Sequence, residues 1–184
     1  MKFKKLVTYF EDLEKVSSGN ALRAILADLF KKTKNKEIDK VVYLTLGKIA
    51  PEYSDIVMGM ADKMVLKSIA LAANKDVKKV RAIYKKTGDI GSAAFQTVNN
   101  KGGSLTVEQV FNELNKIAQA SGSGSQGIKL RRLAGLFAKS SKEEAKYIAR
   151  IVLGTLRLVV ASISVLDGLS IAFTGSKNAK DKAV

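Results

Sequence analysis

The residues best placed to do chemistry form a row of cations between Ser141 and Leu158. At about 100° of rotation per residue, one helix over this stretch would hold them within about 80° of each other. They are Lys142, Lys146, Arg150 and Arg157. Such a row suits phosphate groups, although a solvated charged face is the commoner origin of the pattern. Both interpretations stay open at this point.

The helix that would carry this row has a defined start and an apolar side. Ser141 and Glu144 have capping-box spacing, in which the hydroxyl accepts from a free backbone N–H and the carboxylate reaches back. The side opposite the cations is predicted to enter the core. It consists of Ala145, Ile148, Ile151, Val152 and Leu156.

Two glycine-rich segments could bring backbone N–H groups close to phosphate oxygens. Residues 122–126 (Gly-Ser-Gly-Ser-Gln) and 88–91 (Gly-Asp-Ile-Gly) each lead into a predicted helix, whose free N–H groups and dipole favour anions. The first segment could instead be a flexible linker. In the second, Asp89 would repel phosphate, and Gly88 as a helix stop with Asp89 as an N-cap is an equal alternative.

The composition favours a polyanionic partner and excludes several kinds of active site. The 184 residues include 32 Lys and Arg against 17 Asp and Glu, a formal net charge of +15. Such an excess in a small domain points to nucleic acid or an anionic membrane surface. The absence of Cys excludes disulfides and thiolate zinc sites, and the absence of His removes the commonest general base and metal ligand.

Apolar residues recur at helical spacing along the chain, and no segment alternates as a strand would. This predicts an all-α fold, a single compact domain of about ten short helices arranged as helical hairpins. The predicted helices span 2–16, 20–32, 37–46, 61–73, 76–86, 92–98, 107–120, 128–138, 141–158 and 163–173. Residues 99–104 and 121–127 are predicted to be flexible loops.

Residues 151–173 are apolar enough to raise the question of a membrane span. Arg157 and Asp167 lie inside this run, and each would cost roughly 2.5–3.5 kcal/mol near a bilayer centre. The run is therefore interpreted as two buried helices with a turn between them, in a cytoplasmic protein.

Five segments carry a resemblance to a known family. Residues 144–158 (Glu-Ala-Lys-Tyr-Ile-Ala-Arg-Ile-Val-Leu-Gly-Thr-Leu-Arg-Leu) closely resemble the signature of the N-terminal DNA-binding domain of ATP-dependent DNA ligases of the archaeal and eukaryotic type. Residues 88–91, 121–126, 166–167 and 172–177 are each similar to a family segment, in family order. The resemblance covers nearly the whole chain.

The resemblance implies sequence-independent binding of nicked duplex DNA, through phosphates and the minor groove. It implies a helical DNA-binding domain at 1–173 and a polar tail at 174–184, leading toward a catalytic domain in cis. A location in the prokaryotic cytoplasm, on the nucleoid and not on a membrane, is expected. The implied DNA contacts are Gly122, Ser123, Gly124, Ser125, Gln126, Lys142, Lys146, Arg150, Thr155, Arg157, Gly88 and Gly91.

Catalysis is not expected from this chain alone. Ligases of the family attach AMP to a lysine in a Lys-x-Asp-Gly setting, and no such motif occurs here. Residues 100–103 (Asn-Lys-Gly-Gly) lack the acid, and residues 86–89 (Lys-Thr-Gly-Asp) have the wrong order. No catalytic residue, cofactor or metal is therefore expected in this chain, and ATP and Mg are expected only for a full-length ligase.

Some alternatives stay open. Arg157 could contact a phosphate, enter the minor groove, or form a salt bridge, with Asp167 as the candidate partner. Val159 stands where the family usually has glycine, and its side chain would hinder close approach of DNA at this turn. A free-standing RNA- or anion-binding helical protein is the alternative function. A membrane-surface domain would need an exposed apolar helix face, whereas each apolar stripe here has a predicted partner.

Overall fold

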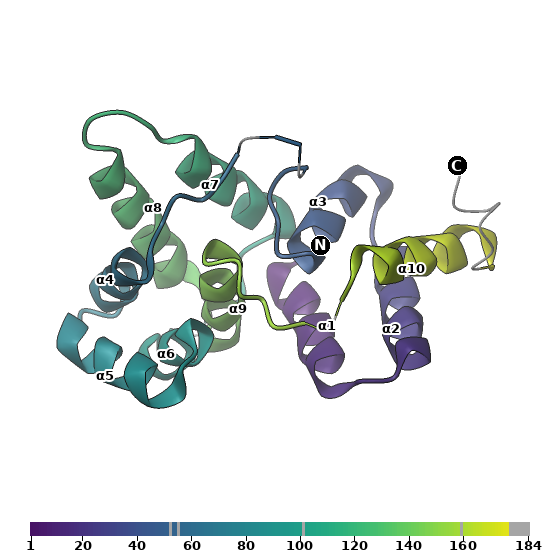
Figure 1. Cartoon of the computed structure of the whole chain (residues 1–184), viewed down its shortest axis with the longest axis horizontal. Helices are drawn as coiled ribbons and strands as arrows, with labels where there is room; N and C mark the ends of the chain where they lie inside the picture. Colours follow the sequence, from purple (N-terminus) through teal and green to yellow (C-terminus); the bar gives the residue numbers. More distant parts are fainter. Residues whose placement is uncertain (52, 55, 101, 159, 177–184) are drawn as a thin grey trace.

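The computed structural model describes residues 1–51, 53–54, 56–100, 102–158 and 160–176. These residues form ten α-helices and a short 3-10 helix, with no strand among them, so the all-α prediction is confirmed (Figure 1). The elements are α1 Phe3–Lys15, α2 Gly19–Lys31, η1 Asn35–Glu37, α3 Ile38–Thr45, α4 Asp62–Ala72, α5 Val77–Thr87, α6 Ile90–Thr97, α7 Val107–Gln119, α8 Ser125–Lys139, α9 Lys142–Val152 and α10 Ser162–Thr174.

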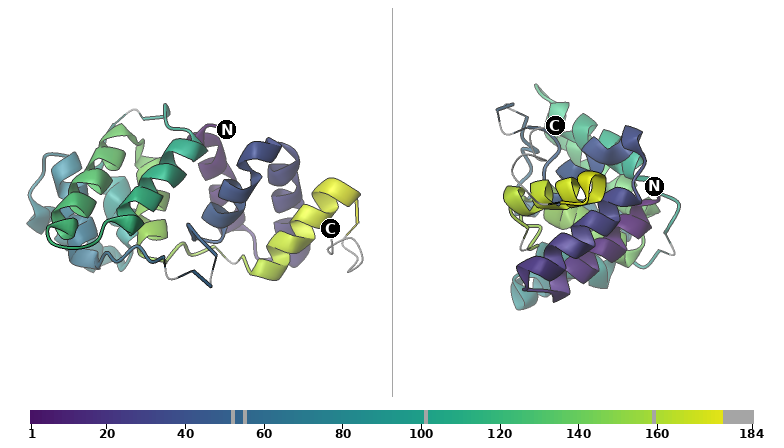
Figure 2. Two further views of the ribbon diagram at one scale, coloured as in Figure 1. Left: turned by 90° about the horizontal axis from the view of Figure 1, so that it is seen from above. Right: turned by 90° about the vertical axis from the view of Figure 1, so that its right-hand side faces the viewer.

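The helices form two groups placed side by side along the long axis of the molecule (Figures 1 and 2). One group contains α1, α2, α3 and α10, and the other contains α4 to α9. The most extensive helix pairs are α10 on α2, α6 on α9 and α4 on α8. Because α1 contacts both α7 and α9, it joins the two groups.

Helix α9 lies on the side of the larger group that faces α1, and it packs most extensively on α6 (Figure 1). Its predicted capping box is present: the Glu144 N–H donates to Ser141 Oγ at 3.2 Å, and the Ser141 N–H donates to Glu144 Oε2 at 2.8 Å. The predicted apolar side is buried, but so are Tyr147, Ala149 and Arg150 on other sides of the helix. Helix α9 is therefore enclosed by protein on most sides, where the sequence predicted a half-exposed helix.

In the loop predicted to be flexible, at 99–104, the described residues Asn100, Gly102 and Gly103 contact the end of α8 and the start of α9. The Gly103 N–H donates to Glu144 Oε2 at 3.2 Å, and the Asn100 amide donates to Ala138 O at 3.0 Å. A Cβ on Gly102 would lie 1.9 Å from the Ser141 nitrogen. The backbones approach so closely there that only glycine fits.

Helix α10 is less buried than the sequence predicted. Among the described helices it packs extensively only on α2, and it leaves Ile163, Leu166 and Phe173 about half exposed along one side. The expectation that each apolar stripe has a partner within the domain is therefore wrong for α10. No helix in the described part of the chain has the length and apolar character needed to cross a membrane.

Candidate nucleic-acid interface

The predicted row of four cations is broken by the end of α9. The Gly154 N–H donates to Ile151 O at 3.0 Å, and the Thr155 N–H donates to Arg150 O at 2.8 Å. With Gly154 at φ 66°, this is a Schellman motif, in which glycine adopts the left-handed conformation at no steric cost. The prediction of one helix over 141–158 is therefore wrong. Thr155 and Arg157 lie in an irregular, exposed segment beyond α9.

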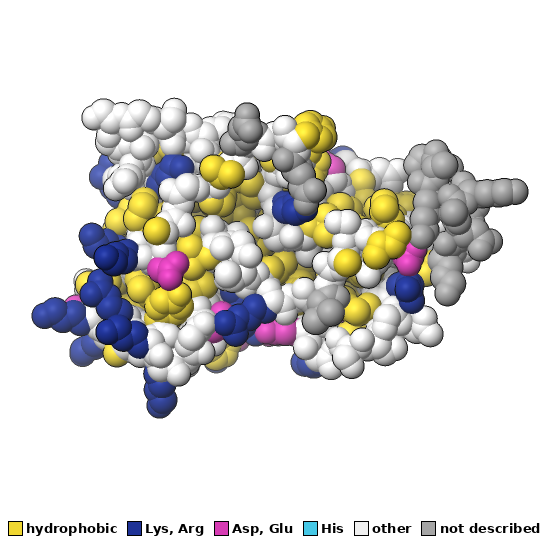
Figure 3. Space-filling model, in the orientation of Figure 1, with side chains coloured by type: hydrophobic (Ala, Val, Ile, Leu, Met, Phe, Trp, Pro, Cys, Tyr) yellow, Lys and Arg dark blue, Asp and Glu magenta, His cyan; other side chains and the backbone are white. Residues whose placement is uncertain are grey.

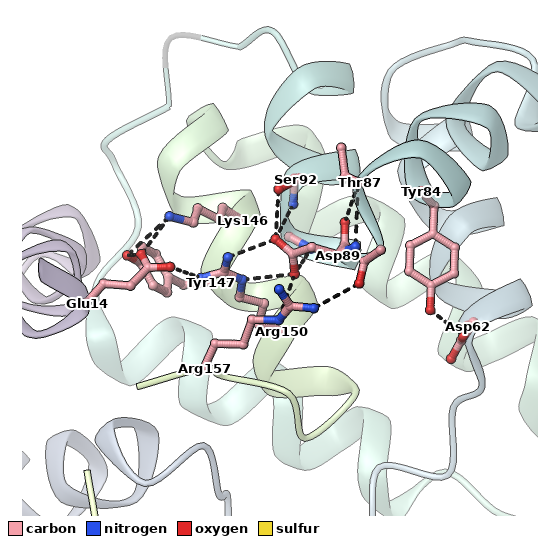
Figure 4. Close-up of polar contacts among 12 residues, drawn as sticks. Glu14, Asp62, Tyr84, Thr87, Asp89, Ser92, Lys146, Tyr147, Arg150 and Arg157 are labelled. Atoms are coloured by element: carbon pink, nitrogen blue, oxygen red, sulfur yellow. Dashed lines mark hydrogen bonds and ion pairs between the residues drawn. The ribbon is translucent and has the colours of Figure 1, made fainter. Parts of the chain in front are cut away.

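Two of the four cationic side chains form short ion pairs within the domain. Lys146 Nζ lies 2.7 Å from Glu14 Oε2 of α1. Arg150 is only 4% exposed, and its guanidinium contacts Glu14 Oε1 at 2.7 Å and Asp89 Oδ2 at 2.8 Å (Figure 4). The predicted phosphate contacts at Lys146 and Arg150 do not fit this arrangement, because both side chains already neutralise carboxylates within the domain.

The two carboxylates of this network stay ionised. Partial burial alone would raise the pKa of Glu14, but hydrogen bonds from Lys146, Tyr147 and Arg150 outweigh it and lower the pKa to about 2. Burial also acts to raise the pKa of Asp89, and its hydrogen bonds with Arg150 and Ser92 outweigh that effect and hold it well below its usual range. At neutral pH Arg150 thus lies between two negative charges, which offset the cost of its desolvation.

Lys142 is the member of the row that remains exposed on α9. Its ammonium lies 4.9 Å from the centre of the Phe95 ring of α6, a cation–π contact at the surface. Lys142 therefore stays accessible to an anion.

Five exposed glycines among the described residues form open turns. Gly88, Gly122, Gly124, Gly154 and Gly175 have φ between 62° and 80°, and a Cβ at any of them would meet nothing within 4 Å. Another molecule could approach the backbone closely at each turn. Gly91 differs, because it is buried and a Cβ there would lie 2.6 Å from Arg150 Nε. Gly91 makes room for Arg150, so the predicted phosphate contact at Gly91 does not fit.

The two glycine-rich helix starts also differ in how their N–H groups are used. Helix α8 begins at Ser125, three residues before its predicted start, with Gly124 as an N-cap that provides no side-chain hydrogen bond. In α6, the Asp89 carboxylate already accepts from the N–H groups of Gly91 and Ser92. The start of α8 is therefore the more open of the two to an anion.

Arg157 brings the segment after α9 to the Gly88 turn. Its Nη2 donates to Gly88 O at 2.8 Å, and its Nε lies 3.7 Å from Asp89 Oδ1 (Figure 4). Its side chain remains 52% exposed. The predicted alternative partner, Asp167, instead pairs with Arg23 of α2 at 2.8 Å.

Residues 122–126 do not join this cluster. The α7–α8 connection lies at the upper left of Figure 1, apart from the α5–α6 junction at the lower left. In Figure 3, Lys and Arg side chains gather at the left-hand end of the molecule, over α4 and α5. Lys85 and Lys86, in the last turn of α5, are exposed and are separated from Gly88 by Thr87 alone.

Comparison with known proteins identifies the family. Residues 2–170 match the family model described as "DNA ligase N terminus". The chain belongs to this DNA ligase family. It is 42% identical over 194 residues to DNA ligase 2 of Thermofilum pendens, which covers 98% of the chain. It is 43% identical over 192 residues to a DNA ligase of Sulfurisphaera tokodaii, which covers 96%.

The match extends over only part of these ligases. A DNA ligase of Pyrobaculum islandicum is 40% identical over 193 residues, covering 100% of this chain but 33% of its own length. The chain thus spans about a third of the length of the ligases that it matches, with 32% for both Thermofilum pendens and Sulfurisphaera tokodaii.

Two residues that shape this candidate site are not marked as such by the sequence. No local pattern singles out Glu14, and for Asp89 the sequence indicates either a helix N-cap or a repulsion of phosphate. Arg150 contacts them across 136 and 61 residues of sequence, so no local pattern could have revealed the pairing. Val159, the position where the family usually has glycine, lies outside the described residues.

Proposed function

We propose that this chain binds duplex DNA without preference for base sequence, as the DNA-binding part of an ATP-dependent DNA ligase. One observation carries the proposal. The exposed Arg157 guanidinium is bonded to the open Gly88 turn and follows the open Gly154 turn in the chain. A guanidinium held beside accessible backbone suits a phosphate or the floor of the minor groove.

The charges around this junction support an electrostatic contact. Because Arg150 compensates Asp89, the carboxylate next to Arg157 does not cancel its charge. Lys85 and Lys86 beside Gly88, and Lys142 on α9, add exposed cations. A ligase must seal nicks in any sequence, and phosphate contacts provide affinity without reading bases.

Residues 122–126 form a second proposed contact, at the start of α8. Their left-handed glycines, exposure and uncapped helix start suit a phosphate of the same duplex. Two separated contacts would grip the backbone on both sides of a nick.

The relatives' greater length supports placing the chemistry elsewhere in a longer ligase. We propose that residues 1–173 form the DNA-binding domain and that residues 174–184 lead to a catalytic domain in cis. That domain would carry the Lys-x-Asp-Gly lysine, a motif that does not occur in this sequence, and would bind ATP and Mg. Such a protein would act in the cytoplasm, on nucleoid DNA.

The test is a salt titration of binding to a labelled, non-sealable nicked duplex. The slope of log affinity against log salt should be about −0.9 per phosphate contact, and Arg157→Ala should make it shallower by about one unit. Lys34→Ala is the control, because Lys34 is exposed in the basic loop between α2 and α3. Equal losses for both variants would show a diffuse charge effect and no defined surface.

The α8 contact has its own variant, Ser123→Asp. A negative charge here should weaken DNA binding, whereas the helix dipole should leave stability unchanged or slightly higher. This variant avoids the strain that a side chain at Gly124, with φ 79°, would cause. Tighter binding to RNA of the same length, or strong dependence on base sequence, would contradict the proposed function.

A further inference from the structure

We propose that Asp89 is a positioning residue for DNA binding, which orients the Arg157 guanidinium against the Gly88 turn so that the two segments form one preassembled contact. This inference rests on the proposed function. It concerns two segments 69 residues apart in sequence that the fold brings together (Figure 4). The inference gives Asp89 a favourable role in DNA binding, although a carboxylate by itself would repel phosphate.

The geometry around Arg157 indicates a fixed arrangement. Arg157 Nη2 donates to Gly88 O at 2.8 Å, while Nε lies 3.7 Å from Asp89 Oδ1. Arg157 also has a left-handed backbone, with φ 59°, which is costly for a residue with a Cβ. Strain of this kind persists where the surrounding structure holds it, and it often marks a functional position. At Arg157 the strained backbone accompanies a side chain that points back to the Gly88 turn.

Asp89 itself is held rigidly. Its side chain accepts from the N–H groups of Gly91 and Ser92, from the Ser92 hydroxyl and from Arg150. Asp89 is only 4% exposed, so it faces Arg157 from within the protein. A carboxylate held by this many hydrogen bonds provides a defined position against which the Arg157 guanidinium can be oriented.

The charges of the network explain why this acid is tolerated next to a DNA contact. Glu14 and Asp89 contribute two negative charges, whereas Lys146, Arg150 and Arg157 contribute three positive ones. The network keeps a net charge of +1, and Arg157 is its most exposed cation. Asp89 can therefore orient Arg157 without removing the charge that attracts phosphate.

The two possible roles of Asp89 predict opposite changes in DNA affinity, and the experiment measures that change. If Asp89 only repels DNA, Asp89→Asn should tighten binding of the 184-residue chain to a non-sealable nicked duplex. If Asp89 orients Arg157, Asp89→Asn should weaken it about fivefold, as coupling between neighbouring residues would give. Asparagine is also a good N-cap, which preserves the start of α6. The control is Asp62→Asn, an exposed acid bonded to Tyr84, which should leave binding unchanged or slightly tighter.

A double-mutant cycle separates positioning from a general structural effect. In an Arg157→Ala background, Asp89→Asn should cause no further loss of affinity, because the residue that Asp89 orients is gone. The same fivefold loss in both backgrounds would overturn the proposal. Thermal unfolding of each variant shows whether it is folded at the assay temperature.

Arg157→Lys provides a test that does not depend on the folding of the Asp89 variant. Lysine keeps the charge but lacks the planar fork that can contact both Gly88 O and Asp89, so binding should again weaken about fivefold. Wild-type affinity for this variant would overturn the inference. If the unaltered chain itself fails to bind the nicked duplex, the proposed function fails as well, whereas binding that Asp89→Asn tightens refutes the positioning role alone.

Discussion

At the scale of single residues, glycines with similar sequence contexts have different roles. Gly88 and Gly122 form open turns, whereas Gly91 and Gly102 are pressed against other parts of the chain. Gly91 makes room for the Arg150 guanidinium, and Gly102 for the backbone at Ser141. A glycine that must stay small for packing is therefore distinguishable from one left open to a ligand only by what surrounds it.

Gly102→Ala should destabilise the protein more than Gly103→Ala does. Both residues have left-handed backbones, with φ 52° and 83°, so an alanine is strained at either position. Only at Gly102 would the new Cβ collide with the Ser141 backbone, whereas at Gly103 it would lie 3.8 Å from Lys4 Cδ. The extra cost at Gly102 should be about 1–3 kcal/mol, measured by urea unfolding. Equal costs would mean that the loop does not pack on α9.

At the scale of helices, the helix ends contribute more to the proposed binding surface than the amphipathic middle turns do. α9 starts with a capping box and stops in a Schellman motif at Gly154, and this stop releases Arg157 from the helix. The start of α6 is capped by Asp89, whereas the start of α8 has no side-chain cap. The helix ends therefore determine where backbone groups are available to a phosphate.

Ser141→Ala should lower the free energy of unfolding by about 1 kcal/mol, because it removes the hydroxyl that accepts from the Glu144 N–H. Ser18→Ala is a matched control, since Ser18 is the N-cap of α2 but makes no capping hydrogen bond with its side chain. The control should change stability by no more than about 0.5 kcal/mol. Chemical denaturation of both variants tests this, and equal losses would argue against a capping contribution at α9.

At the scale of the whole molecule, one ionic network connects the two groups of helices. Glu14 on α1 accepts from Lys146, Tyr147 and Arg150 on α9, and Arg150 continues to Asp89 before α6. The network therefore links the N-terminal hairpin to the proposed DNA-binding surface. The stabilisation that this network provides depends on the ionisation of Glu14 and Asp89.

The contribution of Glu14 to stability should disappear in acid. Its pKa in the folded protein is about 2, below the ordinary value of 4.5, so the folded state favours the charged form. The stabilisation is complete above pH 4.5 and is lost as the pH falls toward 2. Glu14→Gln should therefore be less stable than wild type at pH 7, and the difference should shrink below pH 4.5.

Thermal unfolding between pH 7 and pH 2 measures this difference. Asp12→Asn, which alters an exposed acid of α1 whose ion pair with Lys15 is screened by solvent, should track the wild type throughout. A gap between Glu14→Gln and wild type that stays constant over the whole range would contradict an ionic contribution from Glu14.

The sequence by itself determined the all-α class of the fold, the capping box of α9 and the family. Apolar spacing and capping residues are local, so the all-α fold and the Ser141–Glu144 box could be predicted without tertiary information. The segments similar to ligases are continuous in sequence, so the family could also be recognised without tertiary information. Gly154 is a residue type that often ends a helix, but the apolar pattern continues on both sides of it. The pattern therefore predicted one helix over 141–158.

Only the tertiary structure decided which cations are free. Arg150 and Arg157 look equivalent in sequence, yet one is buried between Glu14 and Asp89 and the other remains exposed beside Gly88. The partners of Arg150 lie 136 and 61 residues away, so packing alone brings them together. A charged side chain is available to DNA when part of it stays exposed, and that depends on contacts made after the helices have assembled.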